Sequence, residues 1–445
     1  MKATLSAALI LGLTTATAVS AAIVTVPVSS WDVPMNLNSE SLTRRYLQKR
    51  QGSSTNVPLT NVENDIIYTI PLGLGSPAQN FNLAIDTGSP ITWVSASSCT
   101  TGGCANSKTF NCAASSTCTT STASFNASYV SGQGVSGTYV ADTFTVGQLQ
   151  FRAVAGIVTT NDAPLPTTVD GIMGLWYYAP GSQIPILNVL ANSTTLTQNM
   201  IGIYLTSSNS KSTTSTGGEI TFGGVNTARF TGDISYTNCV SSRPWSIPVG
   251  GMTVGGKAIS VTGAIAAIDT GTTAMLMPQT VADQINGAIP GAVQVPNQGN
   301  IWILPCSGTT AVTITFGSFT GTIPYTSLAM QSTSQSTSQG NYCLSAAMFP
   351  TGQTATIDEW LIGDAFLKNV YSVFDFSTNA ASGGRIGFAS LGSGGGSTSN
   401  GTTGSGGSTG SGSTKSSASS VKDASFVLQT AVVVLVAGSA LLAGL

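Results

Sequence analysis

The stretch Ala84-Ile85-Asp86-Thr87-Gly88-Ser89 recurs 183 residues later as Ala267-Ile268-Asp269-Thr270-Gly271-Thr272. Each copy ends an apolar run with Asp-Thr-Gly, and each is followed about 90 residues on by an apolar-Gly element, Ile172-Met173-Gly174 or Leu361-Ile362-Gly363. A single Asp-Thr-Gly is a common turn sequence. Two copies in matching surroundings indicate an internal duplication, and hence two related halves.

The two aspartates, Asp86 and Asp269, are candidates for a catalytic pair. Hydrolysis of a peptide bond needs one group that takes a proton from water and another that gives a proton to the carbonyl oxygen. Two carboxyls held about 3 Å apart share one proton, because both cannot ionise cheaply, and together they fill both roles. Gly88 and Gly271, directly after Asp-Thr, allow another chain to approach that closely.

The chain contains no histidine. This excludes Ser-His-Asp and Cys-His hydrolases and the usual histidine-bearing zinc sites. A hydrolase of this composition must use carboxylates, so we expect neither a metal nor another cofactor.

Charge is sparse and weakly acidic. Of 15 Lys and Arg and 17 Asp and Glu, 5 and 2 lie in residues 1–50. Residues 51–445 therefore hold 10 basic and 15 acidic side chains and offer no basic patch to a nucleic acid. Because few carboxylates must stay ionised, we expect the protein to tolerate acid.

From about residue 57 to 390, short β-branched and aromatic runs alternate with Gly, Ser, Thr, Asn and Pro, which predicts a mostly β fold. The predicted strands include Ile66–Leu72, Phe81–Ile85, Thr138–Val146, Ile201–Leu205, Glu219–Phe222 and Val312–Phe316, and the predicted helices are Ile184–Leu190, Pro278–Ile289 and Asp364–Val370. The length of 445 residues favours two lobes. We place them at residues 51–245 and 246–390, one around each Asp-Thr-Gly.

The N-terminus has the composition of processed segments. Lys2, an apolar stretch over Leu5–Leu13 and small residues up to Ala22 predict a secretory signal peptide, residues 1–21, rather than a buried helix. Residues 22–50 resemble a propeptide. The basic pair Lys49-Arg50 would let a dibasic-cutting protease release a mature chain beginning near Gln51.

The C-terminus changes composition twice. Residues 391–420 are almost wholly Gly, Ser and Thr, which predicts a flexible stalk. In residues 421–445, the apolar, uncharged run Phe426–Leu445 follows small residues and a polar spacer, an arrangement typical of a glycosylphosphatidylinositol (GPI) signal. We favour this lipid anchor over a retained transmembrane helix because no basic tail follows the run. The predicted location is therefore secreted and membrane-anchored at the cell surface.

Seven cysteines in a secreted chain allow three disulfides and leave one thiol over. The pairings that we prefer are Cys99 with Cys104 and Cys306 with Cys343, with Cys112 and Cys118 as a third candidate pair and Cys239 left free. Sequence alone does not fix this connectivity. Three Asn-X-Ser/Thr sequons make candidate N-glycosylation sites of Asn126, Asn192 and Asn400.

Over residues 57–390 the chain resembles the pepsin-type aspartic proteases, most closely the fungal secreted and yapsin-like, GPI-anchored members. Trp93 stands seven residues after Asp86, where the family has a tryptophan that hydrogen-bonds the tyrosine of a β-hairpin flap. Tyr129, just before a Gly-rich stretch, matches that tyrosine. The segments 170–175 and 360–367 match apolar segments that thread behind each catalytic loop in the family.

The resemblance implies a mostly β, bilobal pepsin-like fold with an active-site cleft between two pseudo-twofold-related lobes, and we expect a monomer. It implies that Asp86 and Asp269 form the dyad, and it assigns supporting roles to their neighbours. Thr87 and Thr270 would brace the loops, Ser89 and Thr272 would bind the outer carboxylate oxygens, Gly88 and Gly271 would contact the substrate backbone, and Tyr129, bonded by Trp93, would close over the substrate.

The predicted function is that of a secreted, cell-surface, acid-active aspartic endopeptidase whose partner is a protein or peptide substrate. The alternative is a catalytically silent pepsin-fold binding or cell-wall protein, which typically loses an Asp or the Thr-Gly beside it. A third hypothesis is an anchored mannoprotein in which the stalk is functional, although a stalk needs no two-lobed module. Few carboxylates remain to recognise basic residues, so an apolar preference around the cut is slightly favoured.

Overall fold

The computed structural model describes residues 54–392, except 101, 105–106, 130–132, 164, 178–184, 209–211, 241–244, 296–300, 338–339, 350–358 and 378–383. The predicted signal peptide, propeptide, lipid-anchor signal and sequon at Asn400, and nearly all of the stalk, lie outside these residues. Within the described part, no helix is long and apolar enough to cross a membrane.

One large sheet runs through the molecule in the order β12-β27-β26-β10-β11-β1-β2-β3-β9-β4-β8-β7-β6, with β5 added to β4. Its strands are β1 Thr55–Val62, β2 Ile67–Leu74, β3 Gln79–Asp86, β4 Trp93–Ala96, β5 Thr109–Phe110, β6 Thr119–Ser128, β7 Gly134–Val146, β8 Leu149–Asn161, β9 Gly171–Gly174, β10 Met200–Leu205, β11 Thr214–Phe222, β12 Phe230–Asn238, β26 Val370–Asp375 and β27 Arg385–Leu391. The last two strands of the chain thus join a sheet built mainly from its first half.

Three smaller sheets build the C-terminal half. The first contains β13 Ser246–Pro248, β16 Ile265–Ile268, β25 Trp360–Ile362, β17 Met275–Leu276 and β24 Ala347–Met348. The second contains β15 Lys257–Ile259, β14 Gly251–Val254, β20 Val312–Phe316 and β21 Phe319–Ile323. The third contains β18 Val293–Gln294, β19 Trp302–Pro305, β23 Gly340–Ser345 and β22 Ala329–Thr337.

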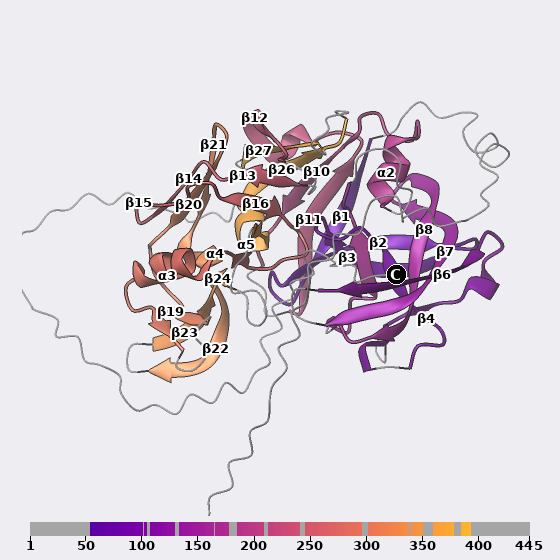
Figure 1. Cartoon of the computed structure of the whole chain (residues 1–445), viewed down its shortest axis with the longest axis horizontal. Coiled ribbons are helices and arrows are strands. Elements are labelled where there is room, and N and C mark those ends of the chain that lie inside the picture. Colours follow the sequence, from indigo (N-terminus) through magenta and orange to yellow (C-terminus); the bar gives the residue numbers. More distant parts are fainter. Residues whose placement is uncertain are drawn as a thin grey trace, which may run out of the picture.

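The helices of the described residues are short. They are α2 Ile186–Ala191, α3 Gln279–Gly287, α4 Tyr325–Leu328 and α5 Asp364–Leu367, with single 3₁₀ turns η2 Gly102–Cys104, η3 Cys112–Ala114 and η4 Thr227–Arg229. Figure 1 shows the two lobes of this mostly β fold, with the purple and magenta strands β3 to β8 on one side, the orange sheets and α3 on the other, and β10, β26 and β27 between them.

Burial along the strands explains why these residues form sheets. In β20, buried and half-buried side chains alternate, as expected for a strand with one face on the core. In β10 and β26 all six residues are buried, because these strands lie inside the sheet shared by the two lobes. A continuous apolar run is typical of a strand that is covered on both faces.

The duplication seen in the sequence reappears as matched strand pairs. β3 pairs in parallel with β9, so that Ala84 lies opposite Ile172 and Asp86 opposite Gly174. β16 pairs in parallel with β25, with Ala267 opposite Leu361. The apolar-Gly elements are therefore the parallel partners of the two Asp-Thr-Gly strands, which explains why each repeat carries both.

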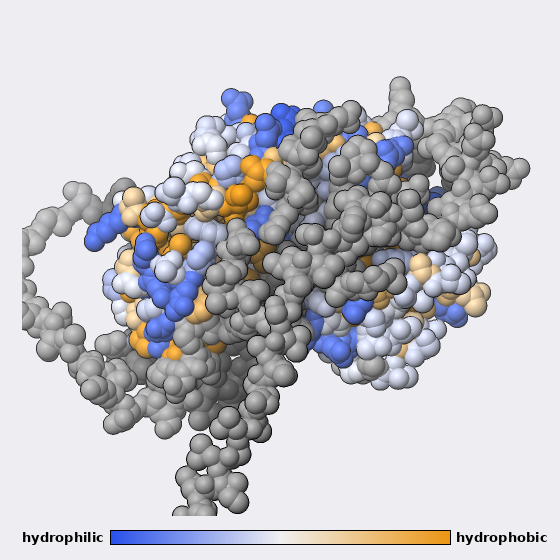
Figure 2. Space-filling model, viewed as in Figure 1, coloured by the Kyte–Doolittle hydropathy of each residue, from blue (hydrophilic) through white to orange (hydrophobic). Residues whose placement is uncertain are grey.

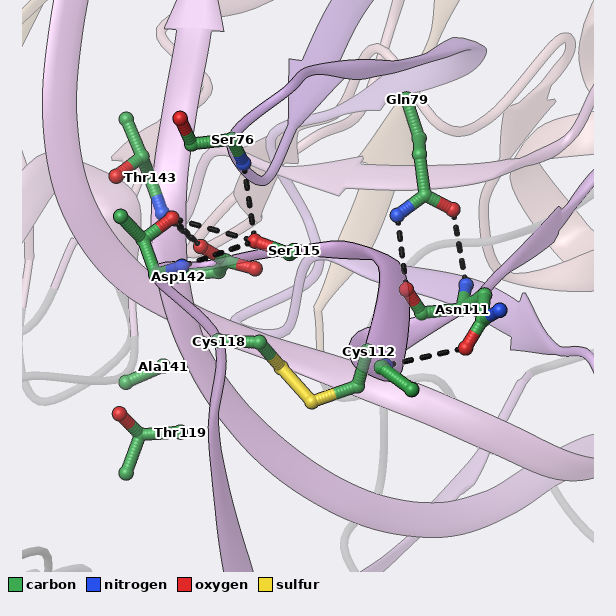
Figure 3. The surroundings of a disulfide bond; sticks show 12 residues. Ser76, Gln79, Asn111, Cys112, Ser115, Cys118, Thr119, Ala141, Asp142 and Thr143 are labelled. Atoms are coloured by element: carbon green, nitrogen blue, oxygen red, sulfur yellow. Dashed lines mark hydrogen bonds between the residues drawn. A yellow bond between two sulfur atoms is a disulfide. The ribbon is translucent and has the colours of Figure 1, made fainter.

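The disulfides are Cys99–Cys104, Cys112–Cys118 and Cys306–Cys343, and Cys239 is a buried free cysteine. Figure 3 shows the second bridge below the turn at Ser76. The Ser76 backbone N–H donates to Ser115 Oγ at 2.9 Å, within the loop that the bridge closes. Gln79 and Asn111 exchange two hydrogen bonds of 2.9 Å beside it. The bridge thus holds a polar loop against the turn that joins β2 to β3.

The surface reflects the scarcity of charge. Figure 2 shows mostly pale atoms of intermediate hydropathy over β6 to β8. Among the residues that the structure describes, four basic side chains form ion pairs, which are Lys108–Asp170, Arg229–Glu219, Lys368–Asp65 and Arg385–Asp375. An ion pair that faces solvent contributes only about 0–1 kcal/mol to the free energy of unfolding. Lys368–Asp65 differs, because both side chains are largely buried and it joins residues 303 positions apart.

Candidate active site

The two Asp-Thr-Gly motifs meet between the lobes. Asp86 is the last residue of β3, and Asp269 follows directly after β16. Both residues are 0% exposed, and Oδ1 of each carboxyl accepts a hydrogen bond from the same Gly88 N–H. The structure therefore brings together the two aspartates that the sequence repeat singled out.

Two threonines fasten the loops to each other. The Thr87 N–H donates to Thr270 Oγ1 at 3.1 Å, and the Thr270 N–H donates to Thr87 Oγ1 at 3.0 Å. Each hydroxyl then donates to a backbone carbonyl of the opposite lobe, Thr87 to Ile268 at 2.8 Å and Thr270 to Ile85 at 3.1 Å. This reciprocal set of four buried bonds fixes the loops across the lobe interface.

Two glycines provide the space and the donors between the carboxyls. The Gly88 N–H donates to Asp86 Oδ1 at 2.9 Å and to Asp269 Oδ1 at 3.1 Å, and the Gly271 N–H donates to Asp269 Oδ1 at 2.9 Å. A Cβ on Gly88 would lie 2.8 Å from Asp269 Oδ1, and one on Gly271 would lie 2.5 Å from Asp86 Cγ. Any side chain here would push the carboxyls apart. The expected contact of these glycines with a substrate backbone stays a prediction.

Two hydroxyls hold the outer oxygens of the pair. Ser89 Oγ donates to Asp86 Oδ2 at 2.6 Å, and Thr272 Oγ1 donates to Asp269 Oδ2 at 2.6 Å. Both side chains are buried. Because each outer oxygen is occupied, the inner oxygens beside Gly88 are left to face each other.

The surroundings raise the pKa of both carboxyls. Burial is the largest cause for Asp86, and the nearby charge of Asp269 adds to it. Burial also raises the pKa of Asp269, while the bonds from Thr272 and Gly271 partly oppose the rise. Two such groups titrate as a pair, so one proton is retained between them over a range of pH.

The flap residues lie as the resemblance implied. Trp93, in β4, donates from Nε1 to the Tyr129 hydroxyl at 2.7 Å, and both side chains are buried. The Tyr129 N–H donates to the Gln133 carbonyl at 2.8 Å. Burial, followed by the charge of Asp86, raises the pKa of Tyr129, so this phenol stays neutral. Residues 130–132, between them, lie outside the described part of the chain.

A small apolar hollow adjoins the dyad loops. Its lining is Ile66, Ile67, Ala84, Ile85, Leu165 and Ile172 from the N-terminal half, and Thr270 and Gly271 from the C-terminal half. None of these lining residues carries a charge.

Two residues near the pair were missed by sequence reasoning. Asp364 is buried at the start of α5, and neither of its carboxyl oxygens has a hydrogen-bond partner among the described residues. Burial, then the charge of Asp269, raises the pKa of this carboxyl well above its usual value. Trp245 bonds to the Leu175 carbonyl and to the Ile268 N–H, in the chain beside the two aspartates. The only sequence signal for Asp364 was its place directly after Leu361-Ile362-Gly363.

The two described sequons are open to solvent. Asn126 is exposed on β6, and Asn192 is exposed at the C-terminal end of α2. Their side chains are therefore accessible to a glycan, which leaves glycosylation a prediction.

A mostly β, two-lobed fold that joins two Asp-Thr-Gly loops around paired buried carboxyls defines the pepsin-like aspartic proteases. Comparison with known proteins agrees, since residues 67–391 match the family model of eukaryotic aspartyl proteases. The chain belongs to this family and is an aspartic-type endopeptidase.

Three fungal proteins are among the relatives. The chain is similar to major aspartyl peptidase 1 of Cryptococcus neoformans var. grubii, at 31% identity over 375 residues, or 79% of this chain and 74% of the relative. It is 32% identical to mucorpepsin of Rhizomucor miehei over 357 residues, 73% of this chain and 78% of the relative. It is 31% identical to a probable aspartic-type endopeptidase of Arthroderma benhamiae over 334 residues, 74% of this chain but only 62% of that relative, less than two thirds of its length.

Proposed function

We propose that the protein is a secreted, acid-active aspartic endopeptidase held at the cell surface by a GPI anchor, in the manner of the yapsin-like members of the family. Asp86 and Asp269 are its catalytic residues. The observation that carries this proposal is the pair of buried carboxyls, joined at their inner oxygens by the Gly88 N–H.

The chemistry follows from one shared proton. The ionised carboxyl of the pair takes a proton from a water molecule, and the water oxygen forms a bond to the scissile carbonyl carbon. The protonated carboxyl gives its proton to the carbonyl oxygen, which produces a tetrahedral diol. When the C–N bond breaks, the carboxyl that took the proton from water passes it to the leaving nitrogen, and the other carboxyl takes a proton from a diol hydroxyl as the carbonyl reforms, so the pair again holds one proton. No covalent bond to the protein forms at any step.

Acid activity follows from the same pair. Burial raises the pKa values of both carboxyls, and the charge of Asp269 adds to the rise at Asp86, so the pair retains one proton in acid and loses it as the pH rises. The composition also suits an acidic medium, because the chain has few carboxylates whose protonation at low pH would lower its stability.

For substrate preference we propose apolar side chains beside the cut. The support is the uncharged lining of the hollow next to Gly271 and Thr270. An uncharged surface beside the cut offers no carboxylate partner to a lysine or arginine of the substrate, whereas contact with an apolar side chain removes apolar area from water.

The location rests on the sequence. Signal peptide 1–21, propeptide 22–50, lobes 51–245 and 246–390, stalk 391–420 and anchor signal 421–445 make up the proposed organisation, with glycans on Asn126, Asn192 and Asn400. Treatment of producing cells with a phosphatidylinositol-specific phospholipase tests the anchor. Release of the protein is expected, and retention after complete cleavage of other anchored proteins would count against it.

The activity test is cleavage of denatured haemoglobin and of a mixed peptide library between pH 3 and 7, with Asp86→Asn and with pepstatin in parallel. We expect pepstatin-sensitive cutting that is fastest in acid, flanked by apolar residues and absent from the variant. If a folded, processed sample cuts nothing at any pH, the catalytically silent binding protein becomes the better account, although the intact motifs argue against it.

A further inference from the structure

Trp245 occupies an unusual position in the backbone. It precedes β13, is 1% exposed and has a φ of 59°. A bulky side chain in this left-handed region is an outlier, held there only when its surroundings over-determine it. The other described non-glycine residues with positive φ are Glu63, Asn64 and Asp65, which form a single hairpin turn. Among the described residues, Trp245 is therefore the buried non-glycine residue with positive φ that lies outside this turn.

Its contacts reach both catalytic loops. The Trp245 carbonyl accepts from the Ile268 N–H at 3.0 Å, one residue before Asp269. Its indole Nε1 donates to the Leu175 carbonyl at 3.0 Å, and the Leu175 N–H in turn donates to the Asp86 carbonyl at 2.7 Å. One residue thus connects the chain beside one catalytic aspartate to the chain beside the other.

Packing fixes the indole in this place. Its ring meets Phe374 edge-on, with centroids 5.1 Å apart, and faces Tyr177 at 6.2 Å. Behind it, the buried Cys239 thiol lies beside the backbone N–H groups of Trp245 and Ser246. Burial raises its pKa to about 12, so it remains protonated.

The pseudo-twofold relation does not account for this arrangement. Ser246 pairs with Ala267 as Thr69 pairs with Ala84, which makes Tyr68 the counterpart of Trp245. Tyr68 has no positive φ, and its hydroxyl donates to the Thr206 carbonyl at 2.9 Å, within the first half of the chain. At this pair of equivalent positions, the Trp245 side chain bonds to the chain beside the other aspartate, whereas the Tyr68 hydroxyl donates within its own half.

We propose that Trp245 is a positioning residue that sets the spacing of the two catalytic carboxyls by joining Leu175 to Ile268. The strained backbone conformation is retained because it lets the Trp245 indole N–H donate to the Leu175 carbonyl while the Trp245 carbonyl accepts from the Ile268 N–H. This proposal rests on Asp86 and Asp269 being the catalytic pair.

The deciding variant is Trp245→Phe, which keeps an aromatic ring but loses the N–H. We expect kcat to fall roughly 10- to 100-fold through misplacement of the reacting groups, with a much smaller change in KM. We also expect the bell-shaped profile of kcat against pH to narrow, because carboxyls that move apart repel less and their two apparent pKa values converge. The other titratable groups that influence the pair, Tyr129 and Asp364 with Lys368 and Asp65 beyond it, are unchanged by the substitution.

The matched control is Trp302→Phe. Trp302 Nε1 donates to Asp283 Oδ1 at 2.9 Å between β19 and α3, so this variant also loses one indole hydrogen bond in the C-terminal half. It should keep the wild-type width of the pH profile. A Trp245→Phe protein that is folded and has the kcat and profile width of Trp302→Phe would overturn the proposal.

A second pair of variants covers the case in which Trp245→Phe does not fold. Cys239→Ala removes the polar group behind the turn and should narrow the profile less strongly, whereas Cys239→Ser keeps a polar group and should resemble wild type. Equal profiles for both cysteine variants would contradict the proposal. Wild type and Asp86→Asn are measured alongside, because a wild type without a bell-shaped profile, or an active Asp86→Asn, would instead refute the assigned dyad.

Discussion

At the scale of single residues, each aspartate of the proposed dyad accepts a hydrogen bond from a hydroxyl three positions further along the chain. Ser89 and Thr272 each donate to the outer oxygen of their own aspartate at 2.6 Å. A donated hydrogen bond stabilises the ionised form and so opposes the rise in pKa that burial causes. The hydroxyls therefore keep one of the two carboxyls easy to ionise in acid.

Replacing Thr272 by Val should show this directly, since Val has the same shape without the donor. Loss of a bond to a charged group is worth about 1.5–3 kcal/mol, or about one pKa unit or more. The pKa of Asp269 rises, so the pair loses its first proton at higher pH. The acid limb of kcat/KM should then move upward by about one pH unit. Thr272→Ser, which keeps the hydroxyl, should behave as wild type, and a Val variant with an unmoved acid limb would contradict this reasoning.

At the scale of secondary structure, loops and cross-links decide how firmly the small sheets are held. Cys306–Cys343 joins residues 37 positions apart and connects the end of β19 to β23, whereas Cys99–Cys104 spans only 5. A cross-link restricts the unfolded chain more as the loop that it closes becomes longer.

Removing each bridge by paired Cys→Ala substitutions should therefore have unequal effects. Loss of Cys306–Cys343 is expected to lower the free energy of unfolding by about 4 kcal/mol, and loss of Cys99–Cys104 by about 2 kcal/mol. Urea unfolding at pH 4 measures both. The opposite order would show that local packing around the bridges outweighs the loop effect.

Sequence patterns alone predict some strands and helices with their correct bounds, and others only in part. Val312–Phe316 is predicted and observed as the same strand, because its alternation matches a half-buried surface. The helix predicted over Asp364–Val370 ends at Leu367, since Val370 begins β26 inside the large sheet. At Val370, pairing in the large sheet overrides the local helical preference.

For the site, the repeat indicated which aspartates, threonines, glycines and hydroxyls the structure brings together, because residue type and spacing were both visible in the chain. Trp245 was missed, since nothing in a sequence marks a tryptophan with positive φ. Asp364 was missed because its burial beside Asp269 depends on two segments 95 residues apart in the chain.

At the scale of the whole molecule, three buried carboxyls link stability to pH. Burial raises the pKa values of Asp86, Asp269 and Asp364. The folded state therefore retains protons that the unfolded chain loses above about pH 4, and stability falls as the pH rises from there through the raised pKa values. Glu219 acts the other way: despite its partial burial, bonds from Arg229 and Asn226 lower its pKa, so its contribution is lost only in stronger acid.

We therefore expect the urea midpoint to be higher at pH 4 than at pH 7. Each retained proton contributes a slope of up to about 1.4 kcal/mol per pH unit. Asp364→Asn replaces one of the three carboxyls by a group that does not titrate, so the loss between pH 4 and 7 should become smaller. A variant that loses as much stability as wild type over this range would show that Asp364 is not held protonated in the folded state.

The central claim about the molecule is that two carboxyls, Asp86 and Asp269, share a proton across the lobe interface. The measurement that tests it most directly is kcat/KM for one apolar-flanked peptide between pH 3 and 7, for wild type, Asp86→Asn and Asp269→Asn. We predict a bell-shaped profile with its maximum in acid for wild type, and a loss of about 10³-fold or more for each variant. Substantial activity in either variant, or a wild-type rate that only rises toward neutral pH, would contradict the shared-proton dyad.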